Sequence, residues 1–452
     1  MTKILKYSFL LFIALLITNC SFDHKTGLWS GQDNEKKRIE ELERRQNSKI
    51  EVLKIYTRKN LFSKEIDANN AVKLSKPINK ISWEVAGSNL QNLSGNIYLP
   101  NINKNFLKKK VGKKKYLLSK IKFSPLTHKG SLFITDDTGS IYKISKQGKV
   151  DWRSNIYKKI YKKIYKNLSI VIHDNKIYVS DNIGFVYAIN IQTGKLEWIK
   201  NHGVPLKSKI KIYKEKIYLI NQDNRLVCLN IKDGSLIWDH RSISSFIKTQ
   251  DFLGLAISKN GDLVTLDSSG SLSKLKADNG KFYWSLNIES SNLIQSDGFF
   301  TSSDIVVENN EVFFSTPYSF FAYNMENGYL KWEKNIASKN TPIIDNENVF
   351  VVSDNGFFLN LDRNTGKIIF SKNILKDLKK KKQKTNIVGF IMGSGKIYAV
   401  SKNGYLIVAS ATSGKVENFK KVSDSILSSP IISEGSLYIL TENSKILGFG
   451  DQ

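Results

Sequence analysis

A glycine followed by a lysine recurs along the chain, and this pair could bind phosphate. The stretches "QTGKLEW" (192–198) and "GSGK" (393–396) both contain it. The second stretch lacks the Ser or Thr after the lysine and the longer glycine spacing of a phosphate-binding loop. In two related stretches the lysine is replaced by Ser235 and Tyr329, which a phosphate-binding role would not permit. We therefore interpret the Gly-Lys pair as part of a turn.

Histidine and cysteine, the other candidates for catalysis or metal binding, are sparse and scattered. The five histidines show no metal-ligand spacing, and the chain has no Gly-x-Ser-x-Gly nucleophile motif. The two cysteines, Cys20 and Cys228, imply no disulfide framework. Cys228 in "LVCLN" is expected to fill core as a small apolar residue. The sequence thus predicts no catalytic residue, metal or cofactor, and a protein that is not an enzyme.

The Gly-Lys turn belongs to a repeat that runs along most of the chain. Six steps separate Gly148 from Gly414, which gives a mean period of about 44 residues. A period near this length, with four short strands per copy, is typical of a β-propeller blade. Five copies end at a tryptophan four positions after the glycine. The repeat residues are Gly148, Gly194, Gly234, Gly280, Gly328, Gly366 and Gly414, with Trp152, Trp198, Trp238, Trp284 and Trp332.

Each copy combines a turn glycine with a strand that has one apolar face. The glycine can adopt φ > 0 and so close a tight turn. Leu196 and Trp198 lie two and four positions after Gly194, so both face the same side of a strand. We expect each tryptophan to pack between blades, and its truncation to alanine to cost about 3–5 kcal/mol.

Eight hairpins precede these turns, and they set the number of blades. Each blade is expected to contain an inner strand A, hairpin strands B and C, and an outer strand D. The last hairpin has no D strand after it, whereas the pair Ile81 and Trp83 in "NKISW" has no hairpin before it. We therefore expect an all-β, eight-bladed β-propeller of four-stranded blades, closed by an N-terminal strand at Ile81–Trp83. The hairpins lie near 130–144, 175–190, 215–230, 261–275, 311–324, 347–362, 395–409 and 435–449.

The N-terminus has the features of an export signal. Two lysines precede the apolar run Tyr7–Ile17, which is shorter than the roughly 20 residues that span a bilayer but fits a signal peptide. Cys20 follows closely, as in a bacterial lipobox, and would then be lipidated; a simple membrane-anchoring start is the alternative. Either way the chain leaves the cytoplasm. This argues against a nucleic-acid partner despite the net charge of +28.

The chain is therefore expected to have three parts. Residues 1–20 form a lipoprotein-type signal peptide that ends at Cys20. Residues 21–75 are charged, with weak helical periodicity, and are expected to form a flexible or partly helical tether. A helix that docks on a partner is the alternative. Residues 76–452 form the propeller.

The motif in "AINIQTGKLEW" (188–198) resembles the repeats of pyrroloquinoline-quinone-type propellers, and the resemblance covers about residues 76–452. One branch of this superfamily comprises quinoprotein dehydrogenases, which typically have a vicinal cysteine pair and calcium ligands over the channel. In this chain no two cysteines adjoin. The other branch comprises BamB-type lipoproteins of the outer-membrane β-barrel assembly machinery, which the lipobox-like start, the single-domain length and the short tether resemble.

The resemblance to the BamB branch implies a non-catalytic scaffold, lipid-anchored on the periplasmic side of the outer membrane. Its partner would be the β-barrel insertase, through BamA-like periplasmic domains, and the chain would be a monomer within that complex. A quinone-dependent dehydrogenase and a propeller that binds lipopolysaccharide or carbohydrate are the alternatives.

The same resemblance implies that two connecting loops at adjacent blades bind the insertase. The matching segments are "RSISSFIKTQD" (241–251) and "LIQSDGFFTSSD" (293–304). In the second segment, packing of Phe299 and Phe300 beneath the loop is the alternative to a partner contact. The candidate partner-binding residues are Phe246, Ile247, Lys248, Asp297, Phe299 and Asp304.

Three lysine runs, at 108–115, 157–166 and 376–384, are each expected between a D strand and the next A strand. Connections of this kind share one face of a propeller, so the runs should line that face. They are either solvated insertions or a surface that attracts anionic lipid, lipopolysaccharide or an acidic partner. The Ile-Tyr-Lys-Lys repeat of the second run favours an interfacial role, because it places apolar residues among the charges.

Overall fold

The computed structural model describes residues 21–22, 29–30, 37–38, 41, 62–68, 71–115, 124–242, 253–288, 300–376, 378 and 385–451. The chain divides into two compact units, Met1–Asn60 and Leu61–Gln452. In the first unit, β1 (Ser21–Phe22) pairs antiparallel with β2 (Trp29–Ser30). The predicted signal peptide, Cys20 and most of the predicted tether lie outside the described residues. Within the described part, no helix is long and apolar enough to cross a membrane.

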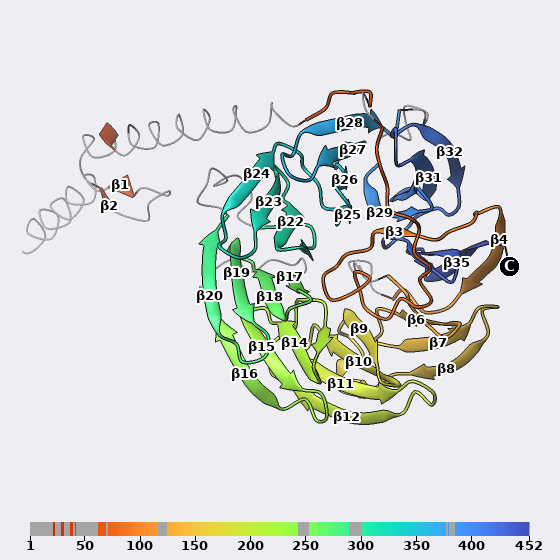
Figure 1. Ribbon diagram of the computed structural model, residues 1–452. Helices are drawn as coiled ribbons and strands as arrows, with labels where there is room; N and C mark the ends of the chain where they lie inside the picture. The colour runs from red at the N-terminus through yellow and green to blue at the C-terminus, as the bar shows by residue number, and fades with distance from the viewer. Residues whose placement is uncertain are drawn as a thin grey trace, which may run out of the picture. The chain divides into compact units, whose positions relative to one another are not determined.

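The second unit contains eight antiparallel sheets, which are the blades of a propeller (Figure 1). In blades 1–7, strand order follows chain order from the inner edge to the outer edge. The predicted all-β, eight-bladed fold is confirmed. Blades 1–4 are β5 (Leu126–His128), β6 (Ser131–Thr135), β7 (Ile141–Ser145), β8 (Val150–Ser154); β9 (Leu168–His173), β10 (Lys176–Asp181), β11 (Phe185–Asn190), β12 (Leu196–Asn201); β13 (Lys211–Tyr213), β14 (Lys216–Ile220), β15 (Arg225–Asn230), β16 (Leu236–Arg241); and β17 (Gly254–Ile257), β18 (Asp262–Leu266), β19 (Ser271–Lys276), β20 (Phe282–Asn287).

Blades 7 and 8 each take a strand from the N-terminal part of the second unit. Blade 7 has a fifth, inner strand, and blade 8 has an outer strand from residues before blade 1. A short 3₁₀ helix, η1 (Lys159–Tyr161), lies between blades 1 and 2. Blades 5–8 are β21 (Val306–Glu308), β22 (Glu311–Ser315), β23 (Phe320–Asn324), β24 (Leu330–Lys334); β25 (Ile343–Asp345), β26 (Asn348–Val352), β27 (Phe357–Asp362), β28 (Ile368–Asn373); β3 (Asn96–Ile97), β29 (Ile387–Gly393), β30 (Lys396–Ser401), β31 (Tyr405–Ser410), β32 (Val416–Lys421); and β33 (Ile431–Ser433), β34 (Ser436–Leu440), β35 (Lys445–Gly450), β4 (Lys104–Lys110).

The burial pattern within a blade explains why the middle strands are so apolar. Both faces of β10 and β11 pack against neighbouring blades, and their central residues are buried. The outer strand β12 is exposed except at Trp198, which is half-buried. A strand covered on both faces favours a continuous apolar run, whereas an outer strand needs one anchoring side chain.

The repeat tryptophans join each blade to the next. Trp152 of blade 1 donates its indole N–H to the backbone oxygen of Ile191 in blade 2, at 3.1 Å. Trp332 of blade 5 donates in the same way to Arg363 O of blade 6, at 2.8 Å. All seven repeat glycines adopt φ between +66° and +81°, the left-handed region that favours glycine.

Closure of the ring by an N-terminal strand is confirmed, but the predicted strand is wrong. β4 pairs antiparallel with β35, from Lys110 opposite Lys445 to Lys104 opposite Gly450. Leu107 occupies the position that tryptophan takes in other blades. Trp83 instead exchanges two backbone hydrogen bonds of 3.0 Å with Thr127 of β5, at the inner edge of blade 1. Ile81–Trp83 is therefore not an outer strand.

Two segments differ from the organisation that the sequence predicted. The start of the first lysine run, Lys108–Lys110, belongs to the outer strand β4, so that run does not lie wholly in a connection between blades. Part of the predicted tether, residues 62–68 and 71–75, packs in the second unit: Ile66 bridges Ser371 of β28, and Phe62 N donates to Asn335 O at 2.9 Å.

Candidate functional site

An N-terminal segment, residues 75–97, crosses the centre of the ring and bonds to strand A of each of the eight blades. In Figure 1 it appears in orange among the inner strands. We call it the central segment. Most of these bonds go to the ends of the inner strands where strands A turn into strands B. The pairs, from β5 to β33, are Trp83–Thr127, Glu84–Ile172, Ala86–Lys211, Leu90–Ile257, Gln91–Val307, Ser75–Asp345, Ile97–Gly393 and Ile81–Ser433.

A buried lysine of blade 3 holds the central segment in place. Lys211 is fully buried, and its Nζ donates to Ala86 O at 3.1 Å, Asn89 O at 2.7 Å and Asn92 Oδ1 at 2.6 Å. Burial, reinforced by repulsion from Lys209, lowers its pKa to about 7. All three protons of its ammonium group thus find acceptors, which is the condition for a buried lysine to be tolerated.

Asn92 extends these Lys211 contacts, which we call the lysine clamp, to the next two blades. Its amide nitrogen donates to Leu255 O at 3.0 Å and to Ile305 O at 2.8 Å. A single side chain therefore joins the central segment to blades 4 and 5, while its oxygen accepts from Lys211 of blade 3.

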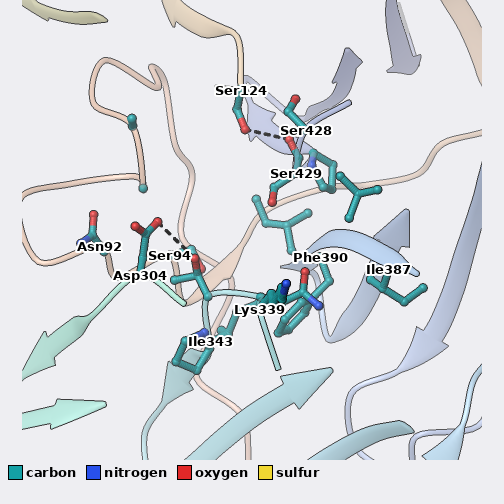
Figure 2. A pocket seen from close by; sticks show the side chains of 18 of the residues that line it. Asn92, Ser94, Ser124, Asp304, Lys339, Ile343, Ile387, Phe390, Ser428 and Ser429 are labelled. Atoms are coloured by element: carbon teal, nitrogen blue, oxygen red, sulfur yellow. Dashed lines mark hydrogen bonds between the residues drawn. The ribbon is translucent and has the colours of Figure 1, made fainter. Parts of the chain in front are cut away.

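A cavity of about 320 Å³ lies on the other side of the central segment (Figure 2). Its walls come from the central segment, from residues that precede the inner strands, and from the inner strands β25 and β29. Two buried polar atoms in its lining, Trp83 Nε1 and Ser428 Oγ, have no hydrogen-bond partner among the described residues. Ser124 donates its hydroxyl to Ser429 O at 2.8 Å across one wall.

An ion pair crosses this cavity between blades 3 and 5. Lys209 Nζ donates to Asp304 Oδ2, and Thr341 Oγ1 of the blade 6 side donates to the same oxygen at 3.3 Å. Burial opposes ionisation of Asp304, but attraction to Lys209 outweighs it and holds the pKa below its usual range. Asp304 was predicted as a partner-binding residue. That role stays a prediction, and the structure shows its carboxylate already engaged in the channel.

The two segments predicted to bind the insertase connect adjacent blades on this face. The first lies between β16 and β17, and the second between β20 and β21. Phe300, in the second segment, is partly buried and packs against the core of blades 4 and 5. The other predicted contacts, Phe246, Ile247, Lys248, Asp297 and Phe299, lie outside the described residues.

Side chains of metal-ligand type come together once among the described residues. His173 Nε2 lies 3.5 Å from Asp174 Oδ2 and 3.2 Å from Glu215 Oε1, on two turns of blades 2 and 3. Both carboxylates are largely exposed, and their bonds to the histidine account for the arrangement. Cys228 is buried, and desolvation raises the pKa of its thiol to about 11, so it is not a reactive thiol.

Sequence reasoning did not find the central segment or its clamp, although one signal was present. Lys211 begins the inner strand β13, opposite Tyr218. The matching positions of other blades hold apolar residues opposite an aromatic, such as Leu126 and Ile343. A lysine at an apolar position of a buried strand implies a partner for its charge.

Comparison with known proteins identifies the group to which this fold and repeat are similar. A family model described as outer membrane protein assembly factor BamB matches residues 137–372. A protein of that name from Moranella endobia is 21% identical over 298 residues, which cover 60% of this chain and 72% of the relative. Matches to other bacterial proteins of the same name span 43–62% of their length, about half.

Solved structures show the same architecture in proteins with different names. BamB from Moraxella catarrhalis has a TM-score of 0.62 at 12% identity, over 77% of this chain and 99% of that chain. A quinohemoprotein alcohol dehydrogenase from Comamonas testosteroni has a TM-score of 0.65 at 10% identity, over 82% and 80%. At such identities the likeness shows the fold alone.

Proposed function

The chain belongs to the family of the outer membrane protein assembly factor BamB, and on that premise we propose that it is a non-catalytic scaffold in outer-membrane protein assembly. It is anchored by a lipid on Cys20, faces the periplasm, and binds the β-barrel insertase. The contact is made by the connections between blades 3 and 4 and between blades 4 and 5, with Ile247 and Lys248 at its centre.

The observation that carries this proposal is the position of the two connections. They leave neighbouring blades at β16 and β20 and return at β17 and β21, so both start from the same face. Their ends are fixed by buried residues: Leu253 and Ile288 are buried, and Phe300 packs on the core. Two loops on rigid bases, side by side, can grip one partner domain.

A scaffold is also the function that the channel supports best. The cavity's charged pair, Lys209 and Asp304, is mutually neutralised. Cys228, the free cysteine among the described residues, is buried and does not line the cavity. The polar groups of the central segment form hydrogen bonds to the inner strands, which stabilises the ring. The face that carries the connections between blades is left for binding.

The test is recovery of the insertase with this protein. Envelopes are extracted in mild detergent, the tagged full chain is captured, and its partners are identified by mass spectrometry. We expect the insertase to be recovered with the wild type and to be reduced at least tenfold by the pair Ile247→Glu and Lys248→Glu, because two contacts become mismatched charges.

A matched pair away from both loops controls for charge. Ile199→Glu and Lys200→Glu make the same chemical change on the outer strand β12 of blade 2, where both residues are exposed. This pair should leave insertase recovery unchanged. Capture of the wild type without the insertase, or equal loss with both pairs, would contradict the proposed function.

A further inference from the structure

The connection between blades 1 and 2, residues 155–167, is held to the propeller along one side. Tyr157 donates its hydroxyl to Asp181 Oδ2 at 2.5 Å, and Tyr161 packs edge-on against Phe185 with ring centroids 5.6 Å apart. Lys166 is buried, donates its backbone N–H to Asp137 O at 3.0 Å, and donates its Nζ to Tyr161 O. This connection, which we call the anchored loop, therefore has a defined conformation.

The other side of the anchored loop exposes apolar side chains among lysines. Ile160 is 79% exposed, Ile164 44% and Tyr165 38%. Lys158, Lys159, Lys162 and Lys163 are also exposed, and residues 155–167 contain no acidic residue. Exposed apolar side chains that gather on one loop and are rimmed by polar groups are the kind of surface that marks an interaction site.

The structure brings part of a second lysine run to the same place. Lys115 donates its backbone N–H to both carboxylate oxygens of Asp137 at 2.9 Å, and its Nζ donates to Lys162 O at 3.3 Å. Lys113 and Lys114 precede it and are exposed. Lys115 and Lys162, from two connections far apart in the sequence, thus lie side by side and extend the basic surface of the anchored loop.

We propose that the anchored loop is a membrane contact, in which Ile160, Ile164 and Tyr165 enter the headgroup region of an anionic bilayer while the surrounding lysines bind its phosphates. Apolar side chains flanked by lysines are the combination that binds such interfaces, and tyrosine is enriched at headgroup depth. An acidic protein surface would match the lysines but would leave the protruding isoleucines without an apolar environment. The proposal goes beyond the scaffold function and does not depend on the insertase.

The test uses purified protein and vesicles. The chain from residue 20 onward carries Cys20→Ser, so that no lipid on this residue contributes. Binding is measured by co-sedimentation with vesicles of 30% phosphatidylglycerol in phosphatidylcholine and with phosphatidylcholine alone. The loop variant combines Lys158→Glu, Lys159→Glu, Lys162→Glu and Lys163→Glu. The control makes the same charge change at exposed lysines of turns on the opposite face, Lys195→Glu, Lys232→Glu, Lys367→Glu and Lys415→Glu.

We expect wild type to bind the anionic vesicles, the loop variant to bind about tenfold or more weakly, and the control to stay within about twofold of wild type. Insertion itself is reported by a polarity-sensitive dye on Ile160→Cys, since Cys228 is buried and does not compete. The dye should shift to the blue with anionic vesicles, and the same dye on Lys195→Cys should not. No binding by wild type, or equal loss in loop variant and control, would overturn the proposal. Binding without a dye shift would also overturn it, because the contact would then be electrostatic only.

Discussion

A Cβ atom at Gly194 would lie 2.7 Å from Cε3 of Trp152 in the preceding blade, closer than real contacts allow. The relation recurs around the ring, at 2.6 Å between Gly234 and Trp198 and at 2.8 Å between Gly280 and Trp238. The repeated glycine and tryptophan are therefore two halves of one contact between blades. This explains why the sequence motif identifies the fold and says nothing of a ligand.

Substitution at this contact should destabilise the propeller more than a change of backbone conformation alone. Gly194→Ala places a side chain at φ +68° and into the Trp152 ring, and we expect it to lower the free energy of unfolding by about 2–4 kcal/mol. Gly203→Ala is the control, because φ is +74° but no atom lies within 4 Å of the new Cβ. It should cost about 1–2 kcal/mol. Urea unfolding measures the loss of unfolding free energy in both variants. Equal losses would show that the Trp152 ring moves aside at no energetic cost.

The indole hydrogen bond can be separated from the packing of the ring. Trp152 and Trp198 are both half-buried and lie 6.2 Å from an aromatic ring of their own blade. Trp152 Nε1 donates to Ile191 O, whereas Trp198 Nε1 has no partner among the described residues. Trp152→Phe should therefore cost about 1 kcal/mol more than Trp198→Phe in urea unfolding. Equal costs would mean that this hydrogen bond adds nothing to stability.

The sequence predicted the blades well because each blade repeats the same local chemistry. It failed at the closing strand, where that chemistry is absent. β4 is joined to β35 only by pairing, so no turn glycine precedes it, and Leu107 replaces the tryptophan. The segment Ile81–Trp83, which was predicted to be the closing strand, has the right spacing. However, Ile81 is 69% exposed and Trp83 bonds to an inner strand. Spacing alone did not distinguish the inner edge of the ring from its outer edge.

This difference can be tested with one substitution at each location. Leu107 is buried and packs near Gly148, where a Cβ would lie 2.9 Å from Leu107 Cδ1. Leu107→Ala should lower the unfolding free energy by about 2–5 kcal/mol, and Ile81→Ala by less than about 0.5 kcal/mol. Thermal or urea unfolding gives both values. The reverse order would restore Ile81–Trp83 as the closing strand.

The candidate site was less predictable than the fold. The connections between blades followed from the repeat, and the family resemblance selected two of them as candidate partner loops, a role that stays a prediction. The central segment did not, because its bonds to the ring use backbone groups, such as Leu90 O and Gln91 O, that leave no trace in side-chain type. Lys211 and Asn92 are the two side chains that could have indicated this arrangement. Their role depends on a contact between residues more than 100 positions apart in the sequence.

Loss of the lysine clamp should loosen the central segment. Lys211→Met keeps the apolar stem but leaves Ala86 O, Asn89 O and Asn92 Oδ1 without their donor. We expect faster hydrogen exchange at the amides of Ile257 and Val307, which donate to Leu90 O and Gln91 O. Amides of the outer blades serve as the internal control. Unchanged exchange at both amides would show that the segment is held without Lys211.

The same lysine should give stability a specific dependence on pH. Burial lowers the pKa of Lys211 from 10.5 to about 7, so between these values the unfolded chain binds a proton that the folded chain does not. The penalty is complete below pH 7 and disappears as pH rises towards 10.5. Wild-type stability should thus rise relative to Lys211→Met over this interval, by at most about 1.4 kcal/mol per pH unit. Urea unfolding of both proteins at pH 6.5, 8 and 9.5 cancels the titration of the other lysines. Parallel profiles would mean that Lys211 keeps its proton in the folded protein at all three values, with its three oxygen acceptors compensating for burial.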